Sequence, residues 1–483
     1  MADTNQVQLS YVREATFGTT PASALTNLRI TGESFSHTIE NMQSNEIRAD
    51  RQVTALVQAD AAAVGGYEFE LSYGTLPDAI LEAALMGVWG QDSTGVDIDY
   101  TGTAEDISFS STDNSMNSAV TGDFVSVGKF RAGQWVYVSG SDSNDGWHKI
   151  YSVAASKVIF TSDTVIVTEV GTGDTIRVVG AVYWTGATLA AGDANGTYTF
   201  SAGNANYEGI QVGQWLEIRG FTTEANNGYK LVTAVAANGT TFTTQQTTVL
   251  EAQGDTIIVK GSMLRNGDTK HSFTFQRELT DAVQYFAFRG QMVNTFNLNI
   301  AAGEIITGSL ETMGGDIAST DLAQVSFGTG ANVAAPTTDP CTAIANVGSI
   351  MESATLAAIA SDLYVQSISF TVNNNLRGKK AIGTLGNVGI GAGKCDVEGT
   401  INALFNDETL YDKYLAGTPT ALSFKVEDPT GNAYIFTFRN IEFQTDDGGK
   451  ATGNDADVVE NIGFKALRHT DTDCTIQIDK FAA

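Results

Sequence analysis

Two stretches in the middle of the chain repeat each other, and this duplication constrains the fold more than any other feature of the sequence. Gly133–Gly140 (GQWVYVSG) matches Gly213–Gly220 (GQWLEIRG), and Gly173–Gly180 (GDTIRVVG) matches Gly254–Gly261 (GDTIIVKG). The matched segments are 213 − 133 = 80 and 254 − 173 = 81 residues apart. Because the spacing is nearly constant, the middle of the chain is a tandem duplication and not a region of shared composition.

Each repeat has the pattern of a small β module. Apolar and polar residues alternate from Trp135 and from Trp215, as in half-buried strands, and an Asp-Gly or Asn-Gly turn typical of a β-hairpin follows in each copy. A tryptophan on a small module can serve as a ligand platform. Among apolar neighbours in strand alternation, however, the two tryptophans are predicted to fill the cores of the modules.

A fainter similarity brackets the two modules. Tyr285–Gly290 (YFAFRG) resembles Tyr434–Asn440 (YIFTFRN), and a helix-like segment that ends in glycine lies upstream of each, at 76–87 and 406–417. A strand pattern precedes each predicted helix. The sequence therefore predicts one β domain that is present twice, with the two modules inserted into its first copy.

These similarities give a set of expected domain boundaries. We expect a first domain formed by residues 1–95 and 262–316, inserted modules at 96–181 and 182–261, a connector at 317–362 and a second domain at 363–483. The connector is either a linker or an ordered bridge of strand and helix. Within it, Asp339-Pro340 marks a turn, and the segment from Ile350 to Ile359 is compatible with a short helix.

The composition supports a β protein and limits its function. The chain has 27 Lys and Arg against 55 Asp and Glu, a net charge of −28, so it is not built to bind nucleic acid by neutralising phosphates. Fifty glycines, six prolines and 24 phenylalanines favour short strands and tight turns, which predicts a mostly β fold. We expect synthesis in a cytoplasm without membrane insertion, because neither a signal peptide nor an apolar run of about 20 residues is present.

Candidate chemical sites are weak. Gly386–Lys394 is rich in glycine but departs from a phosphate-binding loop, so a flexible loop is predicted. The acidic segment Thr445–Gly449, with Asp455 and Asp457, lacks the spacing of a calcium loop and favours a solvated turn. The four histidines lie in four different segments, and Cys341, Cys395 and Cys474 are scattered, as unpaired thiols would be. We therefore predict no enzyme activity, no cofactor and no metal.

The N-terminal part carries a resemblance to a known family. It runs through Gln8–Pro21 (QLSYVREATFGTTP), Leu28–Phe35, Asn45–Arg51 (NEIRADR) and Gly65–Tyr73 (GGYEFELSY) into the first predicted helix. The order of these segments resembles the major tail tube protein of long-tailed, siphovirus-type bacteriophages. The resemblance covers about the first 95 residues well and the second copy weakly, and it does not extend to the inserted modules.

The resemblance implies a structural virion protein. It predicts a duplicated tail-tube-like β-sandwich or barrel with flanking short helices, in rings that stack into the tail tube and conduct double-stranded DNA to the host without specific binding. Two domains per chain suggest a trimeric ring with pseudo-sixfold symmetry, and about 24 strands in its inner wall would leave a bore of about 40 Å. The expected partners are further copies of the chain, the tape measure protein, the tail terminator and the tail tip proteins. The inserts are expected to resemble the immunoglobulin-like surface inserts of this family.

Two polar segments before the predicted helices are candidate contact loops between subunits or rings. Residues 40–64 mix both charges, whereas 373–394 carries four basic residues and no acid. Solvated loops without contacts are the alternative. The candidate contact residues are Glu40, Glu46, Arg48, Asp50, Arg51, Arg377, Lys379 and Lys380.

Two questions stay open at this point. The acidic residues either face the bore, where they would repel DNA, or lie outside and serve solubility. The main alternative function is a virion surface or tail-tip adhesin whose tryptophan-containing modules bind a host glycan. An all-β hydrolase is a more distant alternative.

Overall fold

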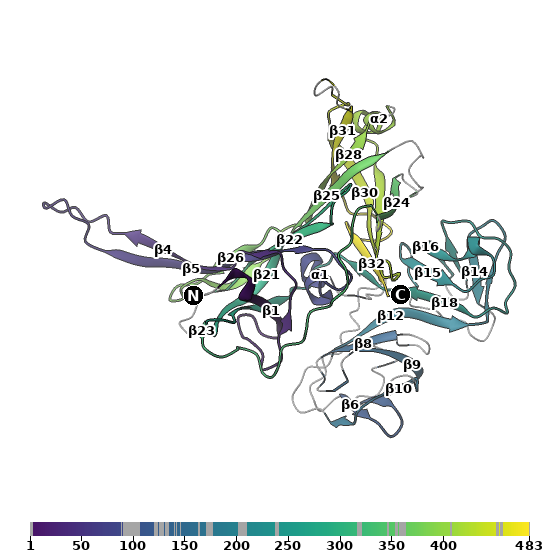
Figure 1. Ribbon diagram of the computed structural model, residues 1–483, viewed down its shortest axis with the longest axis horizontal. Coiled ribbons are helices and arrows are strands. Elements are labelled where there is room, and N and C mark those ends of the chain that lie inside the picture. The colour runs from purple at the N-terminus through teal and green to yellow at the C-terminus, as the bar shows by residue number, and fades with distance from the viewer. Residues whose placement is uncertain are drawn as a thin grey trace. The chain divides into compact units, whose positions relative to one another are not determined.

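The computed structural model describes residues 3–87, 89, 107–119, 124, 130, 135–139, 141, 143–144, 146–162, 165–170, 177–200, 210–236, 241–315, 321–344, 347–352, 356, 364–405, 408–450, 454 and 457–482. The chain is mostly β, with two short α-helices, α1 (Asp78–Leu85) and α2 (Thr409–Ala416), among the described residues (Figure 1). This confirms the predicted fold class.

The chain forms two compact units. Unit 1 consists of Met1–Gly87, Asn266–Gly431 and Thr437–Arg468. Unit 2 consists of Val88–Arg265, Asn432–Phe436 and His469–Ala483.

The centre of unit 1 is a sheet of eight antiparallel strands. They pair in the order β4, β5, β22, β21, β25, β28, β31, β30. Their bounds are Ser36–Gln43 (β4), Leu56–Glu70 (β5), Thr307–Met313 (β22), Gln284–Ala301 (β21), Val365–Asn373 (β25), Asp396–Leu404 (β28), Val459–Ala466 (β31) and Ala433–Asp446 (β30), of which Thr437–Asp446 belong to unit 1. The short β3 (Gly32–Glu33) continues β4 along the same edge of β5. The first four strands and the last four come from separate parts of the sequence, and β21 joins β25 in the middle.

One face of this sheet is the hydrophobic core. Because directly opposed residues in a ladder share a face, the core can be followed from Tyr67 through Leu310, Phe296 and Val372 to Val397, strand by strand. All five side chains are buried. The Phe296 ring packs edge-on against Phe370 with centroids 6.0 Å apart. Burial of these rings makes the junction of β21 and β25 part of the core and not a loose edge contact.

The strands of unit 1 form two series of neighbouring strands with the same pairing order. The first is β1 (Val7–Glu14), β20 (Ser272–Leu279), β21, β22, β5, β4. The second is β24 (Val347–Glu352), β29 (Thr420–Glu427), β30, β31, β28, β25. A β-bulge interrupts β21 between Val293 and Thr295, and another interrupts β30 between Phe443 and Thr445. Helix α1 follows β5, and α2 follows β28.

The inserted repeats in unit 2 form one sheet whose strand order mirrors itself. Six strands, β6-β7-β10-β9-β8-β12, are followed by six others, β18-β15-β16-β17-β14-β13, and β11 (Glu169–Val170) lies outside β6. Their bounds are Ile107–Ser110 (β6), Ser115–Ser118 (β7), Lys157–Phe160 (β10), Gly146–Ala154 (β9), Trp135–Ser139 (β8), Arg177–Gly186 (β12), Ile257–Gly261 (β18), Trp215–Arg219 (β15), Gly228–Val235 (β16), Thr241–Thr244 (β17), Thr197–Phe200 (β14) and Leu189–Ala191 (β13).

The same buried asparagine stabilises both repeats. Asn144 accepts a hydrogen bond from the Val167 N–H at 2.8 Å and donates to Glu169 at 2.8 Å. Asn226 makes the equivalent bonds to Val249 at 2.8 Å and Glu251 at 2.9 Å. The two asparagines are 226 − 144 = 82 residues apart, close to the spacing of the sequence repeat.

Two local expectations were wrong. The segment from Ile350 to Ile359 was interpreted as compatible with a short helix, but Ile350 lies in β24, opposite Phe424 of β29, where it continues a ladder. Beyond Glu352, most of the expected helix lies outside the described residues. The expected flexible loop at 386–394 contains a strand, β27 (Asn387–Gly391), which pairs with β26 (Arg377–Lys380). Glycine-rich sequence thus forms part of an ordered hairpin here.

Candidate functional site

The face of the eight-stranded sheet opposite the core carries small polar and acidic side chains in three rows, which we call the polar face. The central row is Glu68, Ser309, Asn297, Thr371, Glu398, Lys465 and Glu442. The second is Gly66, Glu311, Thr295, Asn373 and Asp396. The third is Glu70, Thr307, Asn299, Ser369, Thr400, Gly463 and Thr445.

The polar face is strongly acidic. Its three rows contain six carboxylates, Glu68, Glu70, Glu311, Asp396, Glu398 and Glu442, and a single cation, Lys465. The remaining positions are Gly, Ser, Thr and Asn, so these rows offer neither a large apolar surface nor an aromatic platform. Such a surface repels polyanions and provides few groups that a passing molecule could bind.

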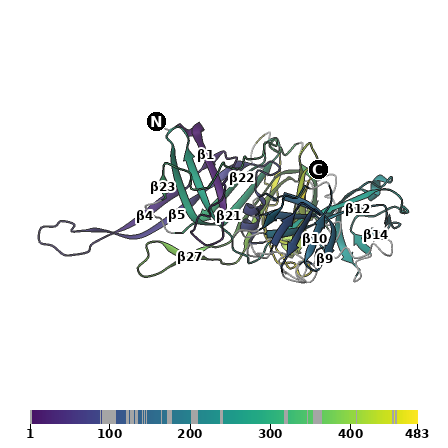
Figure 2. The same cartoon turned by 90° about the horizontal axis from the view of Figure 1, so that it is seen from below.

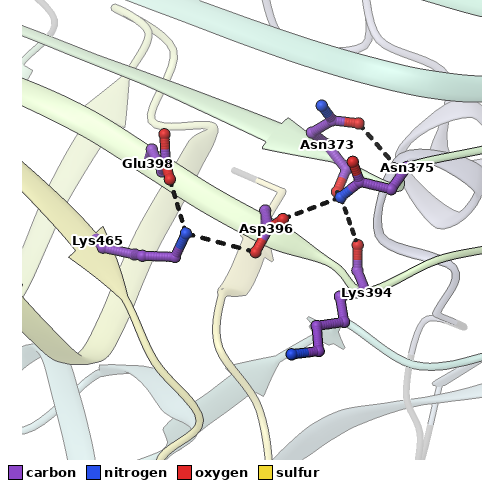
Figure 3. Close-up of polar contacts among 6 residues, drawn as sticks. All are labelled: Asn373, Asn375, Lys394, Asp396, Glu398 and Lys465. Atoms are coloured by element: carbon purple, nitrogen blue, oxygen red, sulfur yellow. Dashed lines mark hydrogen bonds and ion pairs between the residues drawn. The ribbon is translucent and has the colours of Figure 1, made fainter.

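The one lysine of the polar face is held by two of its carboxylates (Figure 3). The Lys465 ammonium lies 2.7 Å from Glu398 and 3.5 Å from Asp396. The hydrogen bond with Glu398 raises the pKa of Lys465. On the other side of Asp396, the Asn375 amide donates to its carboxylate at 3.0 Å and to the Lys394 carbonyl at 2.9 Å. The positive charge of Lys465 is therefore balanced by two carboxylates of the same chain.

The first group of predicted contact residues lies on a long hairpin. β4 and β5 project beyond the other strands of unit 1 (Figures 1 and 2). Glu40 lies in β4 opposite Asp60, and Glu46 lies in the exposed tip. Arg48 and Asp50 form a bidentate ion pair there, with N–O distances of 3.0 and 2.8 Å. This pair lowers the pKa of Asp50 through the hydrogen bond from Arg48.

The tip of this hairpin is apolar as well as charged. Exposed large hydrophobic side chains recur along both strands and the loop between them: Ile39, Met42, Ile47, Val53, Leu56 and Val57. Arg51, beside them, has a φ of 59°, in the left-handed region. A projecting arm with this composition is suited to contact with another protein.

The second group of predicted contact residues lies on a shorter hairpin in unit 1. Arg377, Lys379 and Lys380 are exposed on β26. In both views the hairpin of β26 and β27 lies beside the base of the β4–β5 hairpin (Figures 1 and 2). Lys380 forms an ion pair with Asp60 of β5, and this hydrogen bond lowers the pKa of Asp60. The structure thus joins the two predicted loops through one residue of each.

A buried carboxyl group in unit 2 is a further unusual feature. Asp479 in β32 (Gln477–Phe481) is fully buried, and it accepts hydrogen bonds from the Trp215 N–H at 3.2 Å and the Gln477 amide at 2.7 Å. Burial raises the pKa of Asp479 to about 8. Asp479 lies opposite Met263 in an antiparallel strand pairing, which is the position of a structural group.

Other predicted features have plain structural roles. Trp215 is 1 % exposed and therefore buried, but it is not part of the hydrophobic cluster that contains its strand neighbours Leu216 and Ile218. The side chain of Trp135 lies outside the described residues. In the described part of the chain no group of three His, Cys, Asp or Glu residues could hold a metal ion. No described helix has the length and apolar character needed to cross a membrane. No disulfide joins the three cysteines, all of which are described.

The polar face as a whole was not predicted from the sequence. Its signal was present in the alternation of carboxylates with large apolar residues, as in Tyr67-Glu68-Phe69-Glu70. That pattern identifies a strand with one acidic face but does not say which other strands lie beside it.

Comparison with known proteins identifies the family. The family model described as phage tail tube protein matches residues 4–466, nearly the whole chain. No curated protein matches the chain. Tail tube proteins are structural components of the virion tail and not enzymes, which confirms the predicted absence of enzyme activity and, in outline, the predicted role. The chain belongs to the phage tail tube protein family.

Proposed function

We propose that three copies of the chain form a ring, that the rings stack into the tail tube, and that the tube conducts the phage genome. The eight-stranded sheet is the observation that carries this proposal. Three such sheets give 3 × 8 = 24 strands, enough for a closed barrel with a bore of about 40 Å. A chain with only four strands in this sheet would require six copies for the same wall.

The two halves of unit 1 are proposed to be duplicated tube domains. The two matching sequences of strand pairings, the matching bulges and the matching positions of α1 and α2 support this. Since β24 pairs with β29 as β1 pairs with β20, the second domain is proposed to begin at β24, earlier than residue 363. Each domain then contributes four strands to the wall.

The polar face is proposed to line the bore. Its opposite face is filled by buried aromatic and aliphatic side chains, so the polar face is the side of the sheet available to the lumen. Six carboxylates and one lysine per chain give 3 × (1 − 6) = −15 formal charges per ring on this surface. DNA would be repelled from such a wall and would slide through it without adhering.

The two hairpins are proposed to contact neighbouring subunits or rings. The exposed apolar residues of the β4–β5 tip and the cluster of Arg377, Lys379 and Lys380 support this role. The tape measure, terminator and tip proteins are the further partners proposed for the tube, in the tail of a siphovirus-type virion. The duplicated sheet of unit 2 is proposed as a pair of immunoglobulin-like inserts outside the wall.

Electron microscopy of the purified protein, alone and with tail extract, tests this proposal. Hollow tubes with a bore of about 40 Å are expected. A protein that stays monomeric under both conditions would contradict it.

A further inference from the structure

The eight-stranded sheet has an unpaired edge at each end. At one end, β3 and β4 pair with β5, and no described strand forms a ladder with their other edge. At the other end, β30 pairs with β31 over Ile441–Asp446, and no described strand forms a ladder with the opposite edge of these residues. Unpaired edges of a sheet are templates for pairing with another chain.

The junction in the middle of the sheet shows how two such edges fit. There β21 meets β25 antiparallel, with Thr295 opposite Asn373 and Phe296 opposite Val372. In the matched halves of unit 1, β21 corresponds to β30, and β25 corresponds to β3 and β4. The internal junction is therefore a template for one between β30 and the β3–β4 edge of a second copy.

The correspondence can be stated residue by residue. Thr295 follows the bulge in β21 and Thr445 follows the bulge in β30, so these two residues correspond, with a shift of 445 − 295 = 150. Phe296 then corresponds to Asp446. On the other strand, Ile368 lies opposite Ile401, and Glu33 lies opposite Tyr67. These two pairs correspond in the matched halves, so the shift on this strand is 368 − 33 = 335. Asn373 then corresponds to Thr38, and Val372 corresponds to His37.

We propose that β30 of one copy pairs with β4 of the next in this register, so that Thr445 lies opposite the partner's Thr38 and Asp446 lies opposite the partner's His37. The inference rests on the proposed ring and defines its subunit contact. The occupant of each edge is a second copy of this chain.

The side chains at the two edges support this occupant. Asp446 continues a buried apolar row after Ile401 and Ile462, and its Oδ2 atom is buried without a hydrogen-bond partner. His37 is half-buried against Phe288, with its Nε2 3.1 Å from the Ala287 carbonyl. Because a carbonyl only accepts, Nε2 donates, and a protonated His37 has its Nδ1–H left for a carboxylate. The apolar pair Phe296 and Val372 at the internal junction thus corresponds to an acid, Asp446, and a base, His37, at the two outer edges.

Cysteine cross-linking of assembled tubes tests the register. Thr38 and Thr445 are both exposed, and opposed residues of an antiparallel pair lie about 4.5–5.5 Å apart at Cα, within reach of a disulfide. Oxidised tubes of the T38C/T445C variant should give covalent dimers and trimers in denaturing gels. T295C/N373C, at the internal junction, should cross-link within one chain and serves as the positive control.

Further controls separate the register from the ring itself. T38C/E442C should remain monomeric, since the proposed register places these residues about 10 Å apart. The single-cysteine variants report any reaction with native thiols. Tubes that form while T38C/T445C stays monomeric, with T295C/N373C cross-linked, would overturn the register and leave the proposed function standing. Absence of tubes from the unmodified protein would overturn both.

A second test exchanges the edge pair for the internal one. D446K should abolish polymerisation, because it places two basic groups together in a half-buried contact. The H37V/D446F variant recreates the Val372–Phe296 pair and should polymerise at least as readily as the unmodified protein. Normal tubes from D446K, with the chain folded by circular dichroism, would contradict the proposed contact.

Discussion

Phe296 of β21 and Val372 of β25 lie opposite each other in the ladder that joins the two halves of unit 1, and both side chains are buried. Phe296 also stacks near Phe69, with ring centroids 6.4 Å apart, and contacts Phe370. One aromatic side chain therefore packs against strands from both halves. The contact makes the eight strands a single sheet within one chain, which is the basis for the proposed wall of three copies.

Phe296→Ala should destabilise unit 1 strongly. Truncating a fully buried phenylalanine typically costs about 3–5 kcal/mol in unfolding free energy, because it removes apolar contacts and leaves a cavity. All five tryptophans lie in unit 2, so the effect on unit 1 is measured by pulsed hydrogen exchange of unit 1 peptides across a denaturant titration. Asn299→Ala, on the same strand but exposed on the polar face, is the control and should change stability by under about 0.5 kcal/mol. Equal unfolding midpoints for the two variants would contradict the packing described.

Reversing charges on the polar face should slow DNA passage without preventing assembly. In the E68K/E70K/E311K variant the face would attract phosphate groups, so DNA would adhere in a salt-dependent manner. The measurement is the rate of genome release from phage that carry the variant tail, at low and high salt. Asp193→Lys, in an exposed turn of unit 2, is a control for a charge reversal away from the sheet. Release at the unmodified rate from the triple variant would show that these carboxylates do not line the path of DNA.

Lys380→Glu should impair assembly by separating the two hairpins. The substitution replaces the ion pair with Asp60 by a repulsion between two carboxylates. Sedimentation should show loss of polymer with the chain still folded. The K380E/D60K variant restores an ion pair of opposite sense and should recover polymerisation if the contact within the chain is what matters. Failure to recover, with R377E and K379E also defective, would instead assign the basic cluster to a neighbouring subunit.

Asp479→Asn should remove a pH-dependent loss of stability in unit 2. The pKa of Asp479 is raised from 3.8 to about 8 in the folded chain, so the native state binds a proton that the unfolded state releases. Folding stability is therefore full below about pH 4 and falls as the pH rises toward 8. The thermal unfolding midpoint of the variant, relative to the unmodified protein, should be higher at pH 8 than at pH 5. A difference that does not change with pH would contradict this assignment.

Local patterns predicted the separate elements well. Strand alternation, hairpin turns and helix termini pointed to the strands around Tyr67 and Phe438 and to both helices, and Gly417 ends α2 in a left-handed conformation as a terminal glycine does. The repeat spacing also pointed to two similar β modules in unit 2, but not to the mirrored order of their strands. These signals lie within short segments, where propensity and periodicity act directly.

The polar face and the edge contacts could not be predicted from the sequence. Glu68 and Lys465 share one row of side chains only because six strands, separated by up to hundreds of residues, align in register. Ile350 shows the same limit, since its segment suits a short helix until a partner strand is available. Both the polar face and the strand at Ile350 depend on pairing between strands that are distant in the sequence, and no local sequence pattern specifies such pairing.

Cryo-electron microscopy of assembled tubes would resolve the strands of the inner wall. We expect three copies per ring, each contributing eight strands to this wall, with Glu68, Glu311 and Glu398 facing the bore. A ring of six copies, or a wall whose bore is lined by the opposite face of this sheet, would contradict it.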